Sequence, residues 1–478
     1  MSKNLIYDIS DRPPMSKRLI FAFQQFLAIL SATIAVPTMI GLPTQIPAAI
    51  FGAGVGTLIY QLFTKFKSPV FLGSSFAFIV PLCTAISFGY CGIMTGTIVA
   101  GLAYVVLALI IRFVGTGWVS KLMPPVIIGP TVTLIGLSLA GNAMGNIVKA
   151  DGAAKSVASG NLVALLCGLI AFFTIIICSV QKKYTMPRLI PFVIGIGVAY
   201  GIASLFTVIG MAADVEYLKI VNWTPVVNNF VNAQGEFVGL SAFFTVPKFA
   251  LVEGLKELFT GELSPEILAA DGNATVITVG GALKMAVTFL PIALVVFAEH
   301  IADHKNLSAI IEKDLIEDPG LNRTLLGDGV GSIAGTLLGV CPNTTYGESV
   351  GCVAVTKNAS VITITTTAVM CMILSFFSPL TTALQTIPSC VMGGVCLTLY
   401  GFIALSGLKM LKSVDLEQNK NVFVIATVLI AGVGGLSIKI TDTVEITTIA
   451  TALILGIVTN TVLNLIENGK TKKSQKDT

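Results

Sequence analysis

Charged residues are scarce in this chain. Of its 478 residues only 11% are Asp, Glu, Lys or Arg, whereas 54% are hydrophobic and the mean hydropathy is +0.88. A soluble domain carries roughly 25% charged residues. A chain this apolar cannot present a wettable surface, so the composition predicts a polytopic membrane protein. It also excludes nucleic acid as a partner, because that needs a basic folded face.

Motifs for metals, disulfides and covalent catalysis are missing as well. The nine cysteines are scattered through apolar segments, without a CxxC pair or a nearby histidine. We expect them to be small packing residues, and neither a disulfide framework nor a zinc site is indicated. No nucleophile–base pair is evident, so the sequence predicts no enzyme, no metal and no cofactor.

Lysine and arginine are concentrated in alternate connections between the apolar segments. They are Lys65, Lys67, Arg112, Lys121, Lys182, Lys183, Arg188, Lys305, Lys313, Arg323, Lys409, Lys412 and Lys420, followed by four lysines in the tail from 470 to 476. Positive charge retained on one side of a membrane sets the orientation of the spans. We therefore expect both termini to be cytoplasmic, an even number of spans, and a location in the cell membrane among its lipids.

The apolar segments predict an all-α fold of about fourteen spans, at about 20 residues each. They lie near 18–40, 46–63, 77–90, 92–113, 124–145, 160–180, 188–211, 282–304, 325–340, 349–357, 359–376, 380–402, 421–436 and 446–466. The third and tenth spans are short, because each follows an extended stretch.

The chain repeats itself about an acidic connection, residues 212–281, which we expect to be external. Residues 123–129 (MPPVIIG) match 387–393 (IPSCVMG), and 54–59 (GVGTLI) resemble 335–339 (GTLLG). Seven spans in each half is an odd number, so the second copy enters the membrane in the opposite sense. Such an inverted repeat is typical of an alternating-access carrier.

Two broken stretches, 71–76 (FLGSSF) and 343–348 (NTTYGE), interrupt this membrane-grade sequence at similar points of the two halves. Glycine, hydroxyl and carboxylate groups are tolerated at bilayer depth only where the backbone is buried in protein or lines a cavity. Paired interruptions at corresponding places indicate a transporter's substrate site.

The span at 282–304 contains the sequence AEHIADH at 298–304. A carboxylate within a membrane helix costs at least ~2.5–3.5 kcal/mol and indicates function. Glu299 and Asp303 are four residues apart and share one helix face. His300 points away from that face and either packs or hydrogen-bonds to a neighbouring span, or supports the site. We expect His304 in solvent near the cytoplasmic end.

The second interruption adds a carboxylate, because Glu348 follows Gly347 where a new helical piece begins. Glu348 either caps that helix or accepts a hydrogen bond from a ligand, and the helix N-terminus leaves N–H groups free. Phe76 and Tyr346 occupy matching positions and either pack or stack on a flat ring.

This inventory predicts the ligand's chemistry. Two carboxylate acceptors, backbone donors and aromatic faces, without a fixed cation, suit a small planar neutral molecule with N–H donors and C=O acceptors. A carboxylate removed from water binds a proton more readily. Glu299 is therefore the expected proton-coupling group, with Asp303 as a second candidate.

The sequence resembles the nucleobase–ascorbate transporter family of nucleobase:cation symporters, and among them the bacterial uracil permeases. The matching stretches are 11–14 (DRPP), 73–78 (GSSFAF), 115–118 (GTGW), 298–300 (AEH), 313–321 (KDLIEDPGL), 342–348 (PNTTYGE) and 388–395 (PSCVMGGV). They cover nearly the whole chain apart from 212–281.

The resemblance implies a fold of fourteen spans in two inverted repeats. A core domain would comprise residues 15–114 and 282–378, and a gate domain residues 115–211 and 379–466. The external connection 212–281 and a cytoplasmic tail, 467–478, complete the chain. Two short antiparallel strands would precede the broken third and tenth spans, with the substrate between them.

The resemblance also implies site residues and activity. The family's pyrimidine contacts would fall on Glu299, Glu348 and the backbone N–H groups of Phe76 and Gly347, with Tyr346 shaping the pocket. Supporting positions would be Gln25, Ser75, His300 and Ser349. Members are proton symporters and can form homodimers through the gate domain, so uracil and protons are the expected partners.

The chain departs from the family pattern at three places. Ser349 stands where Asn is usual, Gln24-Gln25 replaces a common Gln-His pair, and Asp303 stands where some uracil permeases carry His. A xanthine or purine symporter of the same family, or an anion carrier or channel on the same fold, are the alternatives. Glu348 favours the pyrimidine side, because purine carriers of the family tend to place Gln near there.

Overall fold

The computed structural model describes residues 5–152, 161–183, 185–232, 234–441 and 444–474. Nine helices in this part of the chain are long and apolar enough to cross a membrane. They are α1 (Met15–Met39), α2 (Ile46–Phe63), α4 (Gly89–Val114), α6 (Pro125–Ile147), α7 (Leu162–Val180), α9 (Pro191–Ala212), α13 (Val279–Ile311), α18 (Ser389–Met410) and α20 (Thr448–Ser474). The protein is therefore a multi-pass membrane protein.

In the described chain, three shorter apolar helices lie between these long ones: α3 (Ile79–Ile86), preceded by the turn η2 (Phe76–Phe78), α16 (Val361–Leu374) and α19 (Asn419–Val433). Two further helices, α14 (Leu321–Leu338) and α15 (Gly347–Thr356), flank the second interruption. Short helices α5 (Gly117–Leu122), α8 (Thr185–Leu189) and α17 (Ser378–Gln385) lie in connections.

Some predicted boundaries are wrong. The expected span 380–402 is divided into α17 and α18 at Pro388, because the residue before a proline is disfavoured in the helical conformation. The helix expected at 282–304 is longer and runs as α13 from Val279 to Ile311. The antiparallel pairing of β3 (Ile438–Thr441) with β4 (Val444–Ile446) was not expected from the sequence. Helix α20 continues through part of the expected tail, and residues 475–478 lie outside the described chain.

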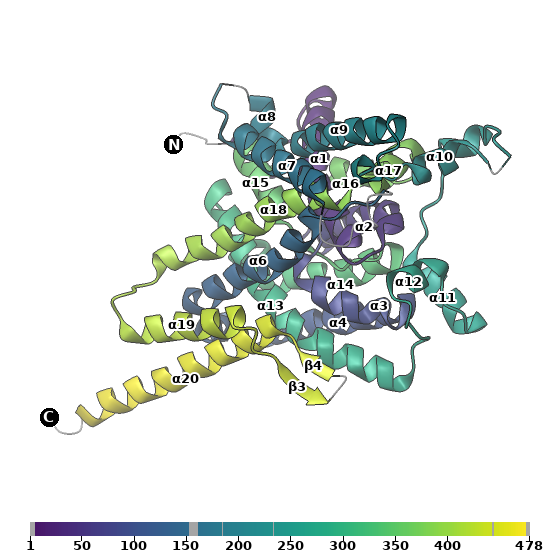
Figure 1. The fold of residues 1–478 in the computed structure, drawn as a ribbon. Coiled ribbons are helices and arrows are strands. Elements are labelled where there is room, and N and C mark those ends of the chain that lie inside the picture. Colours follow the sequence, from purple (N-terminus) through teal and green to yellow (C-terminus); the bar gives the residue numbers. More distant parts are fainter. Residues whose placement is uncertain (1–4, 153–160, 184, 233, 442–443, 475–478) are drawn as a thin grey trace.

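Two groups of helices pack around the centre. In what we call the first helix group, α1, α2, α4, α13, α14 and α16 contact one another. The second helix group contains α6, α7, α9, α18, α19 and α20. Figure 1 shows α19 and α20 at the left of the view and α10 to α12 at the right.

Close glycine contacts bring the backbones of paired helices together. A Cβ atom on Gly52 of α2 would lie 2.3 Å from the carbonyl oxygen of Gly335 on α14. In the second helix group, a Cβ on Gly136 of α6 would lie 2.2 Å from the carbonyl oxygen of Tyr400 on α18. Small residues at such positions let membrane helices approach closely.

The two interruptions meet as a pair of strands. Strand β1 (Leu72–Ser74) pairs antiparallel with β2 (Asn343–Thr345), with Gly73 opposite Thr344. Beyond them, the N–H of Ser75 donates to the carbonyl of Pro342 at 2.9 Å. Both strands are buried, so the ladder satisfies backbone groups inside the helix bundle. After each strand the chain enters a short helix, η2 and α3 or α15.

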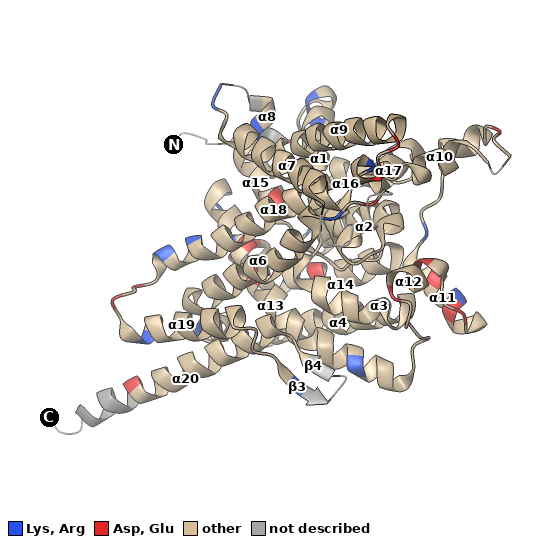
Figure 2. Cartoon of the chain, in the orientation of Figure 1, with Lys and Arg blue, Asp and Glu red and all other residues tan. Residues whose placement is uncertain are grey.

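The connection between the halves folds into short helices. These are η4 (Glu216–Leu218), α10 (Thr224–Phe230), η5 (Gly239–Ala242), α11 (Ala250–Thr260) and α12 (Pro265–Ala270). Figure 2 shows charged residues mainly at the periphery, with several acidic residues around α11 and α12, and a largely uncharged helix bundle.

Candidate functional site

A cavity of about 600 Å³ lies where the two helix groups meet the paired strands. Its walls come from α1, η2, α13 and α15, together with β2, and from α6, α7, α8, α9 and α18. All five residues predicted to bind substrate line it: Phe76, Glu299, Tyr346, Gly347 and Glu348. Ser75 and Asp303 line it as well. The structure therefore gathers residues from both interruptions and from α13, which are far apart in the sequence, around one space.

The carboxylates of α13 differ in their partners. Glu299 is half-buried, and its Oε2 has no hydrogen-bond partner among the described residues. Asp303, one turn further along, is buried and accepts a hydrogen bond from Oγ1 of Thr345 at 2.8 Å. An oxygen without a partner inside a protein calls for a ligand or a proton. Glu299 is thus the more available of the two.

Tyr346 is held between the strands as well as facing the cavity. Its hydroxyl donates to the carbonyl of Ser74 at 3.0 Å. Its ring covers Gly73, where a Cβ atom would lie 2.2 Å from the ring. Only glycine fits at that position. Phe76 in turn packs edge-on against Tyr400 of α18, with ring centroids 5.3 Å apart.

Helix α15 begins at the cavity wall. Its N-cap residue, Tyr346, makes no side-chain capping hydrogen bond in the described structure, and Glu348 lies in the first turn. The first N–H groups of a helix have no partner within the helix, and its N-terminus carries a partial positive charge. Gly347 is exposed at this point, so its backbone can be approached closely from the cavity.

Three of the four expected supporting residues lie behind the cavity wall. Gln25 donates from Nε2 to Oγ of Ser349 at 2.6 Å, and both side chains are buried. This bond ties α1 to α15. His300 is also buried and points away from the cavity, while Ser75 is the one that lines it.

The histidines of α13 form a buried polar network with a residue that the sequence analysis missed, Asp328 of α14. Nδ1 of His300 lies 2.6 Å from Oδ2 of Asp328, and Nε2 lies 3.0 Å from Oγ1 of Thr324. All three side chains are fully buried. A carboxylate within the glycine-rich apolar sequence 326–331 (LGDGVG) was the available signal.

The prediction that His304 is solvated is wrong. His304 is fully buried, stacks on His300 with ring centroids 4.1 Å apart, and lies 2.7 Å from Oη of Tyr60 on α2. Its Nδ1 contacts the carbonyl of His300 at 2.8 Å. Because a carbonyl only accepts, Nδ1 is the donor in that contact. The helix extends past this residue, so it lies inside the bundle rather than at its end.

Cations are present in the cavity wall, contrary to the sequence-based inventory. Arg188 of α8 and Lys409 of α18 are both exposed and line the cavity. In the described residues no group of three His, Cys, Asp or Glu side chains could hold a metal ion.

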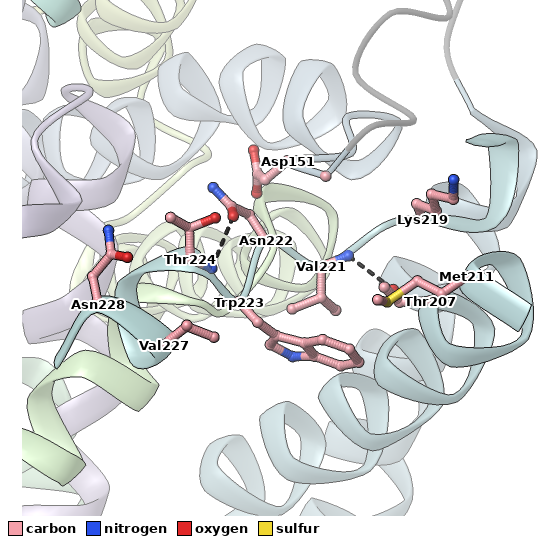
Figure 3. A pocket seen from close by; sticks show the side chains of 11 residues that line it. Asp151, Thr207, Met211, Lys219, Val221, Asn222, Trp223, Thr224, Val227 and Asn228 are labelled. Carbon is pink, nitrogen blue, oxygen red and sulfur yellow. Dashed lines mark hydrogen bonds between the residues drawn. The ribbon is translucent and has the colours of Figure 1, made fainter. Parts of the chain in front are cut away.

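A second hollow, of about 670 Å³, lies beside the start of the connection 212–281. Figure 3 shows Trp223, Thr207 and Asp151 around it. Its polar groups are largely used within the protein, since Val221 donates its N–H to Thr207 and Asp151 accepts from the hydroxyl of Ser389. None of the predicted site residues reaches it, so the central cavity is the better candidate.

Comparison with solved structures shows which fold the chain shares with known proteins. The overall structure of SLC26A9 aligns with a TM-score of 0.62 at 11% identity, covering 95% of this chain and 66% of that one. The transmembrane domain of the cyanobacterial bicarbonate transporter BicA aligns with a TM-score of 0.53 at 12% identity, covering 93% and 97%. The fold is that of these membrane transporters.

Sequence comparison narrows the class to a family. Residues 16–258 and 279–441 match the model Xan_ur_permease, described as a permease family. Uracil permeases are similar over nearly the whole chain: 35% identical in Bacillus caldolyticus, covering 96% of this chain and 94% of the relative, and 33% in Bacillus subtilis, covering 100% and 99%. The uracil permease of Escherichia coli is 31% identical, covering 96% and 94%. The chain belongs to this permease family, the nucleobase–ascorbate transporters, and is a transporter rather than an enzyme.

Proposed function

We propose that this protein imports uracil together with protons. The observation that carries the proposal is that Glu299 lines a cavity shared with Glu348 and the start of α15, and that its Oε2 has no hydrogen-bond partner among the described residues. The similarity to uracil permeases over the whole chain supports uracil as the substrate.

The cavity's groups suit uracil's edges. Uracil offers two N–H donors and two carbonyl acceptors on a flat neutral ring. Glu299 and Glu348 would accept from the N–H groups, and the backbone N–H groups of Phe76 and Gly347 would donate to the carbonyls. The ring of Phe76 would cover one face of the base. Xanthine has similar edges on a larger ring system, so a purine remains the alternative within the family.

A proton would accompany the substrate because a charge at this depth is costly. If Glu299 crossed the centre of the membrane ionised and without a partner, the free energy of removing its charge from water would not be compensated. Protonation removes the charge, and the acid can then move with the neutral base. Asp303 already has Thr345 as a partner, so Glu299 is the primary coupling group in this proposal.

Alternating access would arise from motion between the two helix groups. We assign residues 15–114 and 282–378 to a core domain and 115–211 and 379–466 to a gate domain. Their seven-span halves would be inverted repeats, giving fourteen spans with both termini cytoplasmic, in the cell membrane. The close pairs α2 with α14 and α6 with α18 support this, because each pairs the same span of the two halves. A homodimer would form through the gate domain.

Uptake of radiolabelled uracil by a transport-deficient strain tests the proposal. We expect accumulation that a protonophore abolishes and that excess unlabelled uracil, but not xanthine, competes away. An empty vector and a membrane-inserted Glu299→Ala variant are the controls. If cells that express the protein accumulate xanthine but take up no more uracil than the empty-vector control, the protein is a purine transporter of the family instead.

Arg188 and Lys409 give an anion carrier a specific observation in its favour. The fold neighbours include a bicarbonate transporter and an anion transporter. That alternative predicts flux of bicarbonate or chloride in proteoliposomes that is independent of the proton gradient and unaffected by Glu299→Gln. We place it second because both cations are exposed, whereas the carboxylates lie deeper in the cavity.

A further inference from the structure

Helix α11 of the external connection carries its apolar side chains on an exposed face. Five large apolar residues are exposed to between 37% and 87%: Leu251, Val252, Leu255, Leu258 and Phe259. At 100° per residue they occupy about 120° of the helix circumference. A soluble surface helix turns such a face toward the protein core. Here the face is uncovered, and Figure 1 shows α11 at the margin of the fold, next to α12.

A second face of α11 packs on the membrane-crossing helix α4. Ala250 and Glu257 on this face are at most 2% exposed. A Cβ atom on Gly254 would lie 2.2 Å from Cε of Met94, and Sγ of Cys91 contacts the carbonyl of Gly254 at 3.0 Å. These contacts fall within the first two turns of α4, so α11 lies at the level where a membrane span emerges.

Glu257 fastens α11 to the start of α4. Its Oε2 accepts from the backbone N–H of Tyr90 at 2.8 Å. Because the first N–H groups of a helix lack partners within it, this carboxylate caps α4 from another helix. The polar residue thus faces the protein and the apolar residues face outward, the reverse of a soluble amphipathic helix.

The third face of α11 is polar. It lies between the apolar face and the face that packs on α4. It contains Glu253, Lys256 and Thr260, and Nζ of Lys256 pairs with Oε1 of Glu253 at 2.8 Å. A helix with one face on a span, one apolar and one charged matches the three environments at a membrane protein's rim: protein, acyl chains and water.

We propose that α11 is a membrane-surface helix whose apolar face inserts among lipid acyl chains beside α4. The occupant is lipid because the apolar face continues onto lipid-exposed surface. Helix α13 begins with Val279 and Leu283, which are 90% and 67% exposed. The start of α13 and α11 contact the same turn: a Cβ on Gly281 would lie 2.9 Å from the ring of Phe88, and a Cβ on Gly89 would lie 2.4 Å from Glu257.

Tryptophan fluorescence in proteoliposomes tests this arrangement. The background is the full chain with both native tryptophans, Trp118 and Trp223, replaced by phenylalanine. A single tryptophan is then introduced as Phe259→Trp on the apolar face or as Thr260→Trp on the adjacent polar face. We expect lipids brominated on their acyl chains to quench Phe259→Trp at least twofold more than Thr260→Trp.

A second matched pair, Leu255→Trp on the apolar face and Lys256→Trp on the polar face, repeats the comparison if a variant of the first pair cannot be purified as folded protein. Absent quenching at both positions would overturn the proposal, because the apolar face would then lie outside the acyl chains. Equal quenching would overturn it as well, because the apolar and polar faces would then share one environment. Unquenched, blue-shifted emission from Phe259→Trp would overturn it too, because a second copy of the chain would then cover the face. Uracil uptake does not enter the readout, so the result is independent of the proposed function.

Discussion

Glu299 and Asp303 face a cavity on one side of α13, whereas His300 and His304 are buried on another side against α14 and α2. All four lie within six consecutive residues of one membrane helix. The histidines have their ring nitrogens occupied by Asp328, Thr324, Tyr60 and a backbone carbonyl. Oδ1 of Asp328 lacks a partner among the described residues, as Oε2 of Glu299 does, but only Glu299 lines the cavity. Polar residues at bilayer depth therefore differ in role according to whether they reach the cavity as well as whether a neighbouring helix satisfies them.

This contrast predicts that substitutions on the two faces affect different properties. Changes on the cavity face should alter transport and leave the folded protein intact. Changes on the histidine face should first lower stability, because an unsatisfied buried polar group costs about 1–3 kcal/mol.

Glu299→Gln should have the largest effect on transport. The amide cannot take up or release a proton, and it presents an N–H group where the carboxylate offers acceptors. Loss of a hydrogen bond to a charged group is worth about 1.5–3 kcal/mol, so uracil accumulation should fall roughly 100-fold. Uptake of labelled uracil measures this. Thermal unfolding in detergent should be unchanged, and full uptake by the variant would contradict the assignment.

Asp328→Ala should have the largest effect on stability. It removes the acceptor for Nδ1 of His300, which is fully buried, and should cost about 1–3 kcal/mol. Thermal unfolding of purified protein measures the loss. Asp328→Asn keeps an acceptor oxygen and is the matched control, which should unfold closer to the unaltered protein. An unfolding temperature unchanged by Asp328→Ala would remove the distinction between the two faces.

Glu348→Gln should weaken binding without abolishing coupling. The side chain still offers one acceptor oxygen beside the N-terminus of α15, but it lacks the negative charge. We expect an affinity for uracil about 10-fold lower, equivalent to about 1.4 kcal/mol. Isothermal titration of purified protein gives the affinity. Protonophore-sensitive accumulation should persist, and its disappearance would show that Glu348 rather than Glu299 carries the proton.

Tyr60→Phe should give a smaller loss of stability on the histidine face. It removes the hydroxyl next to Nε2 of His304 and keeps the ring in place, at a cost of about 1 kcal/mol. Thermal unfolding is again the measurement. A loss as large as that of Asp328→Ala would mean that the stacked histidines act as one unit rather than as separate contacts.

Glu257, outside the membrane spans, should give the smallest effect, as a pH dependence. Burial raises the pKa of Glu257, although hydrogen bonds from Ser264 and Tyr90 oppose it. The state in which α11 packs on α4 (docked) therefore binds this proton more tightly than a state in which α11 has separated from α4 (undocked). Docking is favoured below the ordinary pKa of a glutamate, and that contribution is lost as the pH rises through the raised pKa.

Hydrogen exchange of the Tyr90 and Cys91 amides, relative to their intrinsic rates, should accordingly slow as the pH falls. In Glu257→Gln, the matched control, the pH dependence should disappear. Protection that increases with pH in the unaltered protein would contradict the sign of this effect.

Local patterns in the sequence were sufficient for several conclusions. Composition established a membrane protein, and the four-residue spacing of Glu299 and Asp303 placed them on one helix face, because the helical period is a local property. The interruptions 71–76 and 343–348 were visible because polar groups stand out in apolar sequence. The motifs around them led to the family that the comparisons show.

Only the tertiary structure decided which polar groups are satisfied. Asp328 meets His300 across 28 residues, Tyr60 meets His304 across 244, and β1 meets β2 between the halves. Such pairings depend on which helices pack together, and no local period encodes that. Packing also determines which face of α11 is exposed. The sequence shows that α11 has an apolar face, but only the structure shows that the face with Glu257 is the buried one. The sequence determined the kinds of groups present, and packing determined which of them remain free for a ligand.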